Sequence, residues 1–245
     1  MLPLLARQDH GAIASRYHRM DLTHMTAQSS AQASLMLVES ARYALLRRLA
    51  FAIRHQMVVH LQPIGMVTEL LERRLRSPSP DLAQVHESAA KIHTLHKAAV
   101  QDCLDVITWL APEPGATLTV EAAVQDCVAL LRSNFSFRGF ALRGEAPGMA
   151  QPIARAAGRM LLPAALLALT DGTEGPAEVV VGARPGEDTV VFEATLQRTD
   201  GEPPMGSELN YRRLDWDEVR ALCRAEEVEL SHTDTSATLE FPIQE

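Results

Sequence analysis

Apolar side chains recur at helical spacing over a long stretch of the first half of the chain. Between Ala50 and Leu71, positions three or four residues apart are apolar, with Thr68 as the exception. At about 100° per residue this spacing keeps them on one narrow stripe, as in coiled coils and helix bundles. We therefore predict a long helix over residues 29–76. The stripe consists of Ala50, Ile53, Met57, Leu61, Ile64, Thr68 and Leu71.

A second helix is predicted after a sharp break. Ser77-Pro78-Ser79-Pro80 interrupts the pattern, because proline cannot continue a helix and pushes the preceding residue towards an extended backbone. Another apolar stripe then runs from Val85 to Leu110, before Pro112 and Pro114. Two long helices joined in this way form an antiparallel hairpin. One hairpin cannot bury both stripes, so we expect a homodimer in which two hairpins build a four-helix bundle.

The pattern changes at Thr117 to short helices and strands, which predicts an α+β domain with helices on one face of a mixed sheet. Pro163, inside one helix, suggests a kink. The predicted helices are 120–133, 152–169 and 215–225, and the predicted strands are 140–143, 177–183, 189–197, 228–231 and 237–241. The chain is thus divided into an N-terminal segment, 1–28, that is loosely ordered or forms a short helix, a helical hairpin, 29–111, and an α+β domain, 116–245.

Composition narrows the classes of partner. The formal net charge is −8, which argues against nucleic acid or an anionic membrane as the main partner, because both require a basic face. No apolar run approaches the roughly 18 residues of a membrane span. Cys103, Cys127 and Cys223 are odd in number and lack CxxC spacing, so we expect buried thiols in a cytoplasmic protein, kept reduced by the cytosol.

His55 is the candidate for chemistry. It lies about 160° around the helix from Met57, so it points away from the apolar stripe, and Gln62 points roughly the same way two turns later. Free imidazole is largely neutral at pH 7, and neutral imidazole is a nucleophile that can carry a phosphoryl group. The alternative is an ordinary surface histidine on an amphipathic helix.

The residues around His55 follow a known pattern: Arg54-His55, one further position, four residues, then Leu61-Gln62, Ile64 and later Glu69-Leu70-Leu71. This segment resembles the dimerisation and phosphotransfer helix of the histidine kinase family, and most closely the variant found in sporulation phosphorelay phosphotransferases. The resemblance implies that His55 accepts and donates the phosphoryl group. It also implies that Arg54 and Gln62 flank the histidine and steady the group during transfer.

Two positions depart from the family pattern. The acidic residue that usually follows the histidine is Gln56, and glutamine cannot act as a base. Val59 stands four residues after the histidine, where many members carry a side chain that orients water. The resemblance therefore supports neither autokinase nor phosphatase activity, whereas transfer to and from an aspartate needs mainly the imidazole and a receiver domain with its own magnesium ion.

The second half resembles a degenerate ATP-binding domain of a histidine kinase. Thr117–Val120 and Arg138–Leu142 are similar to the opening of that domain, and Leu161–Asp171 stands where its asparagine-bearing helix is expected. The family's asparagine, its Asp-x-Gly-x-Gly segment and its glycine-rich phosphate loop are missing; 197–214 holds two prolines between its glycines. We expect no cofactor, and we expect Asp171 to be a capping or turn residue and not an adenine ligand. Two alternatives remain: the chain is an active kinase with unusual ATP-binding motifs, or the second half is an unrelated α+β domain.

Two further groups of residues allow more than one interpretation. His93 and His96 share a helix face, with His86 nearby, but no acidic residue or cysteine completes an obvious metal site, so we predict none. An arginine-rich side of the first helix is either a solvated face or a surface for the acidic pocket of a receiver domain. It consists of Arg42, Arg47, Arg48 and Arg54.

The sequence thus predicts a histidine phosphotransfer protein that relays phosphoryl groups between response-regulator receiver domains through His55, without binding ATP. Its expected partners are a receiver domain or a histidine kinase, and a second copy of itself. The rival hypothesis is an inactive, kinase-like adaptor that binds or inhibits a kinase or a response regulator, since Gln56 and Val59 remove groups that usually assist chemistry.

Overall fold

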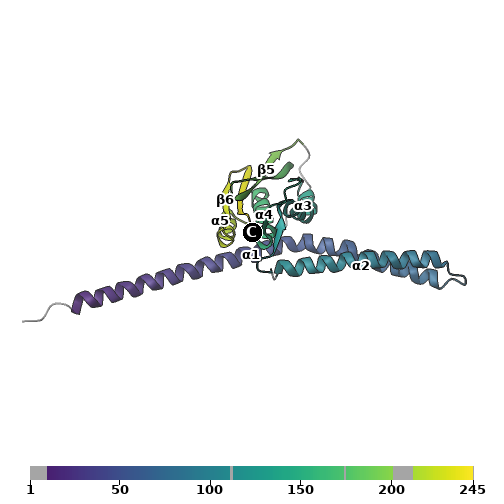
Figure 1. Ribbon diagram of the computed structural model, residues 1–245, viewed down its shortest axis with the longest axis horizontal. Coiled ribbons are helices and arrows are strands. Elements are labelled where there is room, and N and C mark those ends of the chain that lie inside the picture. The colour runs from purple at the N-terminus through teal and green to yellow at the C-terminus, as the bar shows by residue number, and fades with distance from the viewer. Residues whose placement is uncertain (1–9, 111–112, 174, 201–211, 245) are drawn as a thin grey trace, which may run out of the picture.

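A helical hairpin carries a smaller domain on its side. The computed structural model describes residues 10–110, 113–173, 175–200 and 212–244. Helix α1 runs from His10 to Leu75, without a break at Pro63, and α2 runs back along it from Leu82 to Leu110. The remaining elements form a domain seated on the middle of α1, as Figure 1 shows. Helix α1 begins well before residue 29, where its start was predicted.

The domain has the predicted α+β composition. Helices α3 (Val120–Phe137), α4 (Arg155–Asp171) and α5 (Trp216–Ala225) accompany β1 (Thr117–Thr119), β2 (Phe140–Glu145), β3 (Pro152–Ala154), β4 (Ala177–Pro185), β5 (Thr189–Arg198), β6 (Glu229–His232) and β7 (Ser236–Pro242). The main sheet has the order β2-β4-β5-β7-β6. It is mixed, because β2 pairs with β4 in parallel while the other pairs are antiparallel. Strands β1 and β3 form a separate antiparallel pair.

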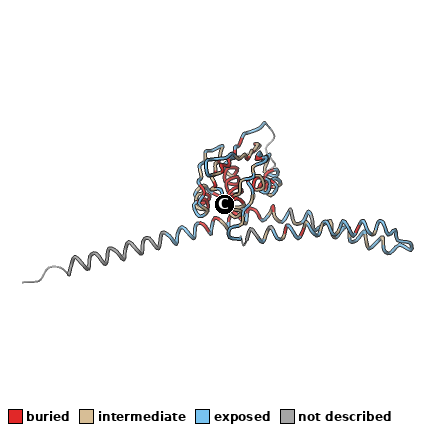
Figure 2. Tube along the Cα trace, in the orientation of Figure 1, coloured by how far each residue is buried: buried red, intermediate tan, exposed pale blue. Residues whose placement is uncertain are grey.

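Burial alternates along the strands, as expected for a sheet with one covered face. In β4, Ala177, Val179 and Val181 are buried, and Glu178 and Val180 between them are less so. The inward-facing side chains pack against the helices, and Figure 2 shows buried residues concentrated in this layer. The alternation explains why the strands were predictable from sequence.

One prediction for this domain was wrong at its boundary. Pro152–Ala154 was expected to begin a helix, but it forms β3, opposite β1, and α4 starts only at Arg155. Proline lacks the N–H that an internal helix position donates, yet a short edge strand tolerates it. Helix α4 then continues through Pro163 to Asp171.

The core of the domain extends onto the hairpin. Val38, Ala41, Leu45 and Leu49 of α1 are buried in the same cluster as the side chains of α3 and α4. Their spacing of three and four residues makes one face of α1 part of the domain. The part of α1 that follows this contact runs alongside α2 (Figure 1).

The hairpin itself buries its apolar stripes only in part. Met57, Ile64 and Leu71 of the predicted stripe are half-buried, whereas Leu61 is 48% exposed and Ala50 is exposed. This is the outcome expected for a single hairpin, and the dimeric four-helix bundle stays a prediction. No helix within the described residues has the length and hydropathy needed to span a bilayer.

Candidate functional site

His55 lies on the surface of α1, in the part of the helix that leaves the α+β domain. Ala52, three residues earlier, is buried, while Arg54, His55 and Gln62 are exposed. The direction inferred from the helical period therefore agrees with the structure. A partner protein can reach the imidazole, although the role of these three residues stays a prediction. The side chain of Gln56 lies outside the described part of the chain.

Aromatic contacts bring the α+β domain next to His55. The Phe51 ring, one turn before His55, meets the Phe137 ring at the end of α3 edge-on, with centroids 6.2 Å apart and planes at 79°. The guanidinium of Arg54 lies 5.6 Å from the centroid of the Phe51 ring. Aromatic pairs and cation–π contacts of this kind favour a fixed arrangement. A sequence pattern could not reveal this pairing, because Phe51 and Phe137 are far apart in the chain.

A buried ion-pair cluster fixes the domain on α1. Arg48 donates two hydrogen bonds to Asp171, from Nη1 to Oδ2 at 2.5 Å and from Nη2 to Oδ1 at 2.8 Å. Arg138 Nη2 donates to the same carboxylate at 2.9 Å, and Arg138 Nη1 donates to the Thr170 hydroxyl at 3.1 Å. The side chains of Arg48 and Asp171 are only 4% and 6% exposed. We call Arg48, Arg138, Thr170 and Asp171 the clasp.

The clasp corrects the interpretation of the arginine-rich side of α1. Arg48 is buried against Asp171, and Arg42 pairs with Glu39 and with Glu226 at the end of α5. Neither arginine therefore belongs to a free basic surface. Asp171 does end a helix, as expected, but its main contacts are with two arginines from α1 and the α3 terminus. Ion pairs between residues so distant in the chain leave no local signal in the sequence.

Charge in the clasp is unevenly balanced. Two guanidinium groups share one carboxylate, and Arg213 adds a further positive charge nearby. Burial lowers the pKa of Arg138, while the charge of Asp171 raises it and that of Arg48 lowers it again. Because Asp171 is the group that offsets the two arginines, its loss would leave uncompensated buried charge.

The space between α4 and the sheet is filled with apolar side chains. The cavity there measures about 10 Å³, roughly the room for one water molecule. Nothing of nucleotide size fits between these surfaces. The proline-containing segment around Gly201 and Gly206 lies outside the described residues. The cavity is lined by Leu162, Ala165, Leu166, Val181, Phe192, Ala194, Ala237 and Leu239.

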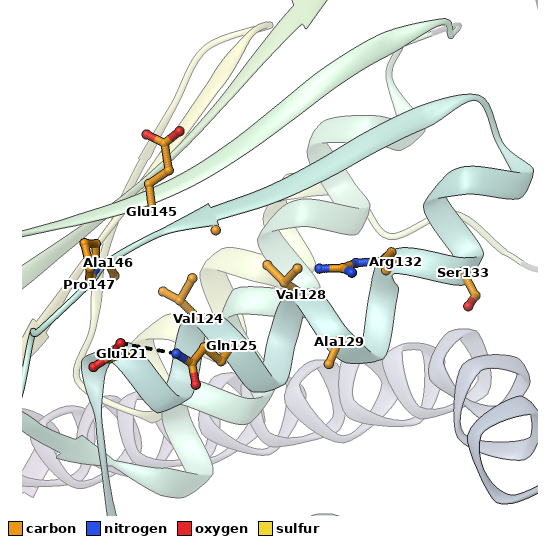
Figure 3. A pocket seen from close by; sticks show the side chains of 11 residues that line it. Glu121, Val124, Gln125, Val128, Ala129, Arg132, Ser133, Glu145, Ala146 and Pro147 are labelled. Atoms are coloured by element: carbon orange, nitrogen blue, oxygen red, sulfur yellow. Dashed lines mark hydrogen bonds between the residues drawn. The ribbon is translucent and has the colours of Figure 1, made fainter. Parts of the chain in front are cut away.

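A larger groove of about 980 Å³ lies between α3 and the edge strand β2 (Figure 3). Glu121 and Glu145 lie towards one end and Arg132 towards the other, with Val124 and Val128 between them. Glu121 already accepts hydrogen bonds from Gln125 and from the Gly148 N–H. Among the described residues that line the groove, Arg132 is the sole cation, so the groove lacks the converging donors that a triphosphate requires.

The remaining candidates form no site in the described residues. His93 and His96 are exposed on α2, and no group of three histidine, cysteine, aspartate or glutamate side chains in the described chain is arranged to hold a metal ion. Cys103, Cys127 and Cys223 are free thiols; the latter two are buried as predicted, whereas Cys103 is only half-buried, so its predicted burial was wrong. Burial raises the pKa of Cys127 far above its usual range, helped by the charge of Asp126, and raises that of Cys223 to about 12.

Comparison with solved structures finds histidine kinases and a phosphotransferase at low sequence identity. AdeS, a histidine kinase of Acinetobacter baumannii, is 10% identical over 75% of this chain and 98% of its own, with a TM-score of 0.42. A bacterial phosphotransferase is 14% identical over 80% and 95%, with a TM-score of 0.38. A histidine kinase from Burkholderia phymatum is 18% identical over 81% and 96%, with a TM-score of 0.36. No protein-family model and no curated protein matches the sequence.

Proposed function

We propose that this chain is a histidine phosphotransfer protein that accepts a phosphoryl group from one receiver domain on His55 and passes it to another. The observation that carries the proposal is the exposed His55 within its Arg-His…Leu-Gln-x-Ile pattern, on a helical hairpin beside an α+β domain. The proposal includes a cytoplasmic setting, a homodimer, and a receiver domain or histidine kinase as partner.

The transfer is a displacement at phosphorus. A neutral imidazole nitrogen of His55 attacks the phosphoryl group of a receiver's phosphoaspartate, a P–N bond forms, and the P–O bond to the aspartate breaks with the electron pair leaving on the carboxylate. The reverse reaction loads a second receiver. Such a transition state spreads charge over the equatorial oxygens, which the receiver's magnesium ion and a nearby cation stabilise. Arg54, which is exposed beside His55, is the cation that this chain offers, and Gln62 is a further donor.

The absence of ATP use is also part of the proposal. It is supported by the apolar filling between α4 and the sheet, where about 10 Å³ is free, and by the missing asparagine and glycine motifs in the sequence. The chain would need no cofactor of its own. If ATP does bind, it must stabilise the fold, and a rise in Tm with Mg-ATP would contradict this part of the proposal.

The test is transfer from receiver domains carrying radiolabelled phosphoaspartate, with wild type, His55→Ala and His93→Ala side by side. His93 is a matched control, because it is also an exposed histidine on the hairpin. We expect acid-labile, base-stable label on wild type and His93→Ala and none on His55→Ala. Equal labelling of His55→Ala, or no labelling of wild type by any receiver that binds it, would contradict the proposal.

The rival function is an inactive adaptor that binds a kinase or a receiver. It is favoured by Val59, which is 51% exposed on the turn after His55 and offers no group for acid–base chemistry. The same variants separate the two functions in cells. A relay protein loses signalling with His55→Ala, whereas an adaptor keeps both its binding and its effect.

A further inference from the structure

Phe137 is an unusual residue for its position. It ends α3 with 63% of its surface exposed, although the nearby aromatic residues Phe135 and Phe140 are 0% and 3% exposed. Single exposed apolar residues are common on protein surfaces. Phe137, however, does not stand alone, because its ring contacts Phe51 on α1, which in turn lies under the guanidinium of Arg54.

The contact between Phe137 and Phe51 lies at one end of the face of α1 that carries His55. Phe51, His55, Val58 and Gln62 follow each other at intervals of four, three and four residues, which places them on a common side of the helix. Val58 is 45% exposed, so the imidazole lies between an aromatic pair on one side and an exposed aliphatic side chain on the other. An apolar surface surrounding a few polar groups is the usual anatomy of a protein interface centre.

We infer that Phe137 is a docking residue for the receiver domain that exchanges phosphate with His55. This inference rests on the proposed function and names the contact that the α+β domain contributes to it. The occupant follows from continuity with His55 and from charge: Arg54 faces solvent beside the imidazole, and a receiver's phosphorylation pocket is acidic. The clasp supports this contact, because it holds the end of α3, and with it Phe137, near the Phe51 ring one helical turn before His55.

The inference also gives the α+β domain a part in docking that does not depend on nucleotide binding. A docking surface formed by both α1 and the α+β domain contacts a larger area of the partner than α1 alone does. Aromatic side chains at such centres contribute a large part of the binding free energy, since they bury much area with little loss of side-chain freedom. Phe137 therefore acts on docking, and the chemistry remains with His55.

The experiment separates docking from chemistry. Phosphoramidate is a small donor that phosphorylates exposed histidines with release of ammonia and needs no docking surface. Wild type, Phe137→Ala, Phe137→Gln and Tyr43→Ala are loaded with it, and the removal of phosphate from His55 by a receiver domain is timed. Tyr43 is a matched control, an aromatic residue that is also 63% exposed on α1 but three turns before His55.

We expect all four proteins to be loaded at His55 to the same extent. Transfer from Phe137→Ala and Phe137→Gln to the receiver should show a KM raised at least about tenfold with kcat nearly unchanged, and Tyr43→Ala should match wild type. Wild-type transfer kinetics in both Phe137 variants would overturn the inference and leave the proposed function standing. Failure of wild type to be loaded at His55, or to pass its phosphate to any receiver, would overturn both.

Discussion

Asp171 accepts hydrogen bonds from two arginines at a place that water hardly reaches. Breaking a buried ion pair by removing one partner is costly, because the remaining charge stays buried without compensation. Asp171 is the more sensitive partner, since its loss leaves both Arg48 and Arg138 without their carboxylate. At the scale of single residues, we therefore expect the clasp to determine how firmly the domain is held on α1.

Asp171→Ala should lower the free energy of unfolding by about 3–5 kcal/mol, measured by urea denaturation. Glu72→Ala is the matched control, because it removes a carboxylate from a surface ion pair. The side chain of Glu72 is 60% exposed and that of its partner Arg76 is 81% exposed. That change should cost about 1 kcal/mol or less. Equal effects of the two substitutions would show that the clasp contributes no more than a surface ion pair.

Two buried thiols make the folded state less stable as the pH rises into the alkaline range. Burial raises the pKa of Cys223 from 9.0 to about 12 and that of Cys127 further still. The folded state therefore keeps protons that the unfolded state loses above about pH 9, so the contribution of the neutral thiols is complete below pH 9 and is lost as pH rises through the folded-state values. We expect Tm to fall between pH 9 and 11, and less steeply in Cys127→Ala and Cys223→Ala.

Cys103→Ala serves as the control for this measurement, because Cys103 is only half-buried. Its Tm should follow the wild-type pH profile. If Tm fell with pH as steeply in Cys127→Ala and Cys223→Ala as in wild type, groups other than these thiols would cause the loss of stability at alkaline pH.

Residues differ in how far the sequence could determine their surroundings. The outward direction of His55 follows from the helical period alone, and the structure agrees with it. The partners of Arg48 and Arg42 do not follow, because each pairs with a carboxylate more than a hundred residues away, and such pairing depends on the tertiary fold. For the same reason the contact of Phe51 with Phe137 could not be foreseen.

At the scale of elements, the helix termini show local stabilisation. Asp215 caps α5: its side chain accepts from the Glu218 N–H at 2.8 Å, and the Glu218 carboxylate accepts from the Asp215 N–H at 3.2 Å. Glu218 also pairs with Arg212 and is almost fully buried. This capping box satisfies two backbone donors that a helix start leaves unpaired. Helix α5 packs on α1, so a stable start of α5 helps to hold the α+β domain on α1.

Asp215→Ala should destabilise the protein by about 1 kcal/mol, because alanine cannot accept the Glu218 N–H. Asp215→Asn should be close to neutral, since asparagine caps helices about as well as aspartate. Both values are measurable by urea denaturation. An asparagine variant as unstable as the alanine variant would point to the charge of Asp215, and not its hydrogen bond, as the source of the effect.

Elements were predictable where periodicity is strong and neighbouring breakers are clear. Strands β4 and β5 alternate in burial, and proline and glycine mark the turn between them, so their bounds were predicted within two residues. Strand β3 was missed because three residues, Pro152–Ala154, are too few to show alternation. The start of α1 was missed because an apolar stripe reports burial, whereas a helix can continue beyond the part that is packed.

At the scale of the whole molecule, the hydrophobic core extends across the boundary that was predicted between the helical hairpin and the α+β domain. Val38, Ala41, Leu45 and Leu49 of α1 belong to the domain's core cluster, although the change of pattern lies near Thr117. The fold class and the mixed sheet could be predicted, since both depend on local pattern. The seating of the domain on α1 could not, because α1 carries two apolar faces and the sequence does not say which neighbour covers each.

The hairpin leaves a further apolar face open, which is the basis for proposing a homodimer. Val100, Leu104 and Ile107 of α2 follow at helical spacing and are 43%, 50% and 56% exposed. Met66 on α1 is 65% exposed as well. A second copy of the hairpin would cover such stripes on both molecules at once, because a two-fold interface is self-complementary.

Light scattering during size exclusion should give twice 26.8 kDa for wild type. Leu104→Glu should give the monomer mass, because two copies would place like charges in an apolar interface that then has to bury them. Thr94→Glu, the same change of charge at an exposed polar position on α2, should leave the dimer intact. A monomeric wild type, or a dimer that survives Leu104→Glu unchanged, would mean that these stripes do not form a dimer interface. The loading of His55 by phosphoramidate, which needs no second copy, would still be expected in either case.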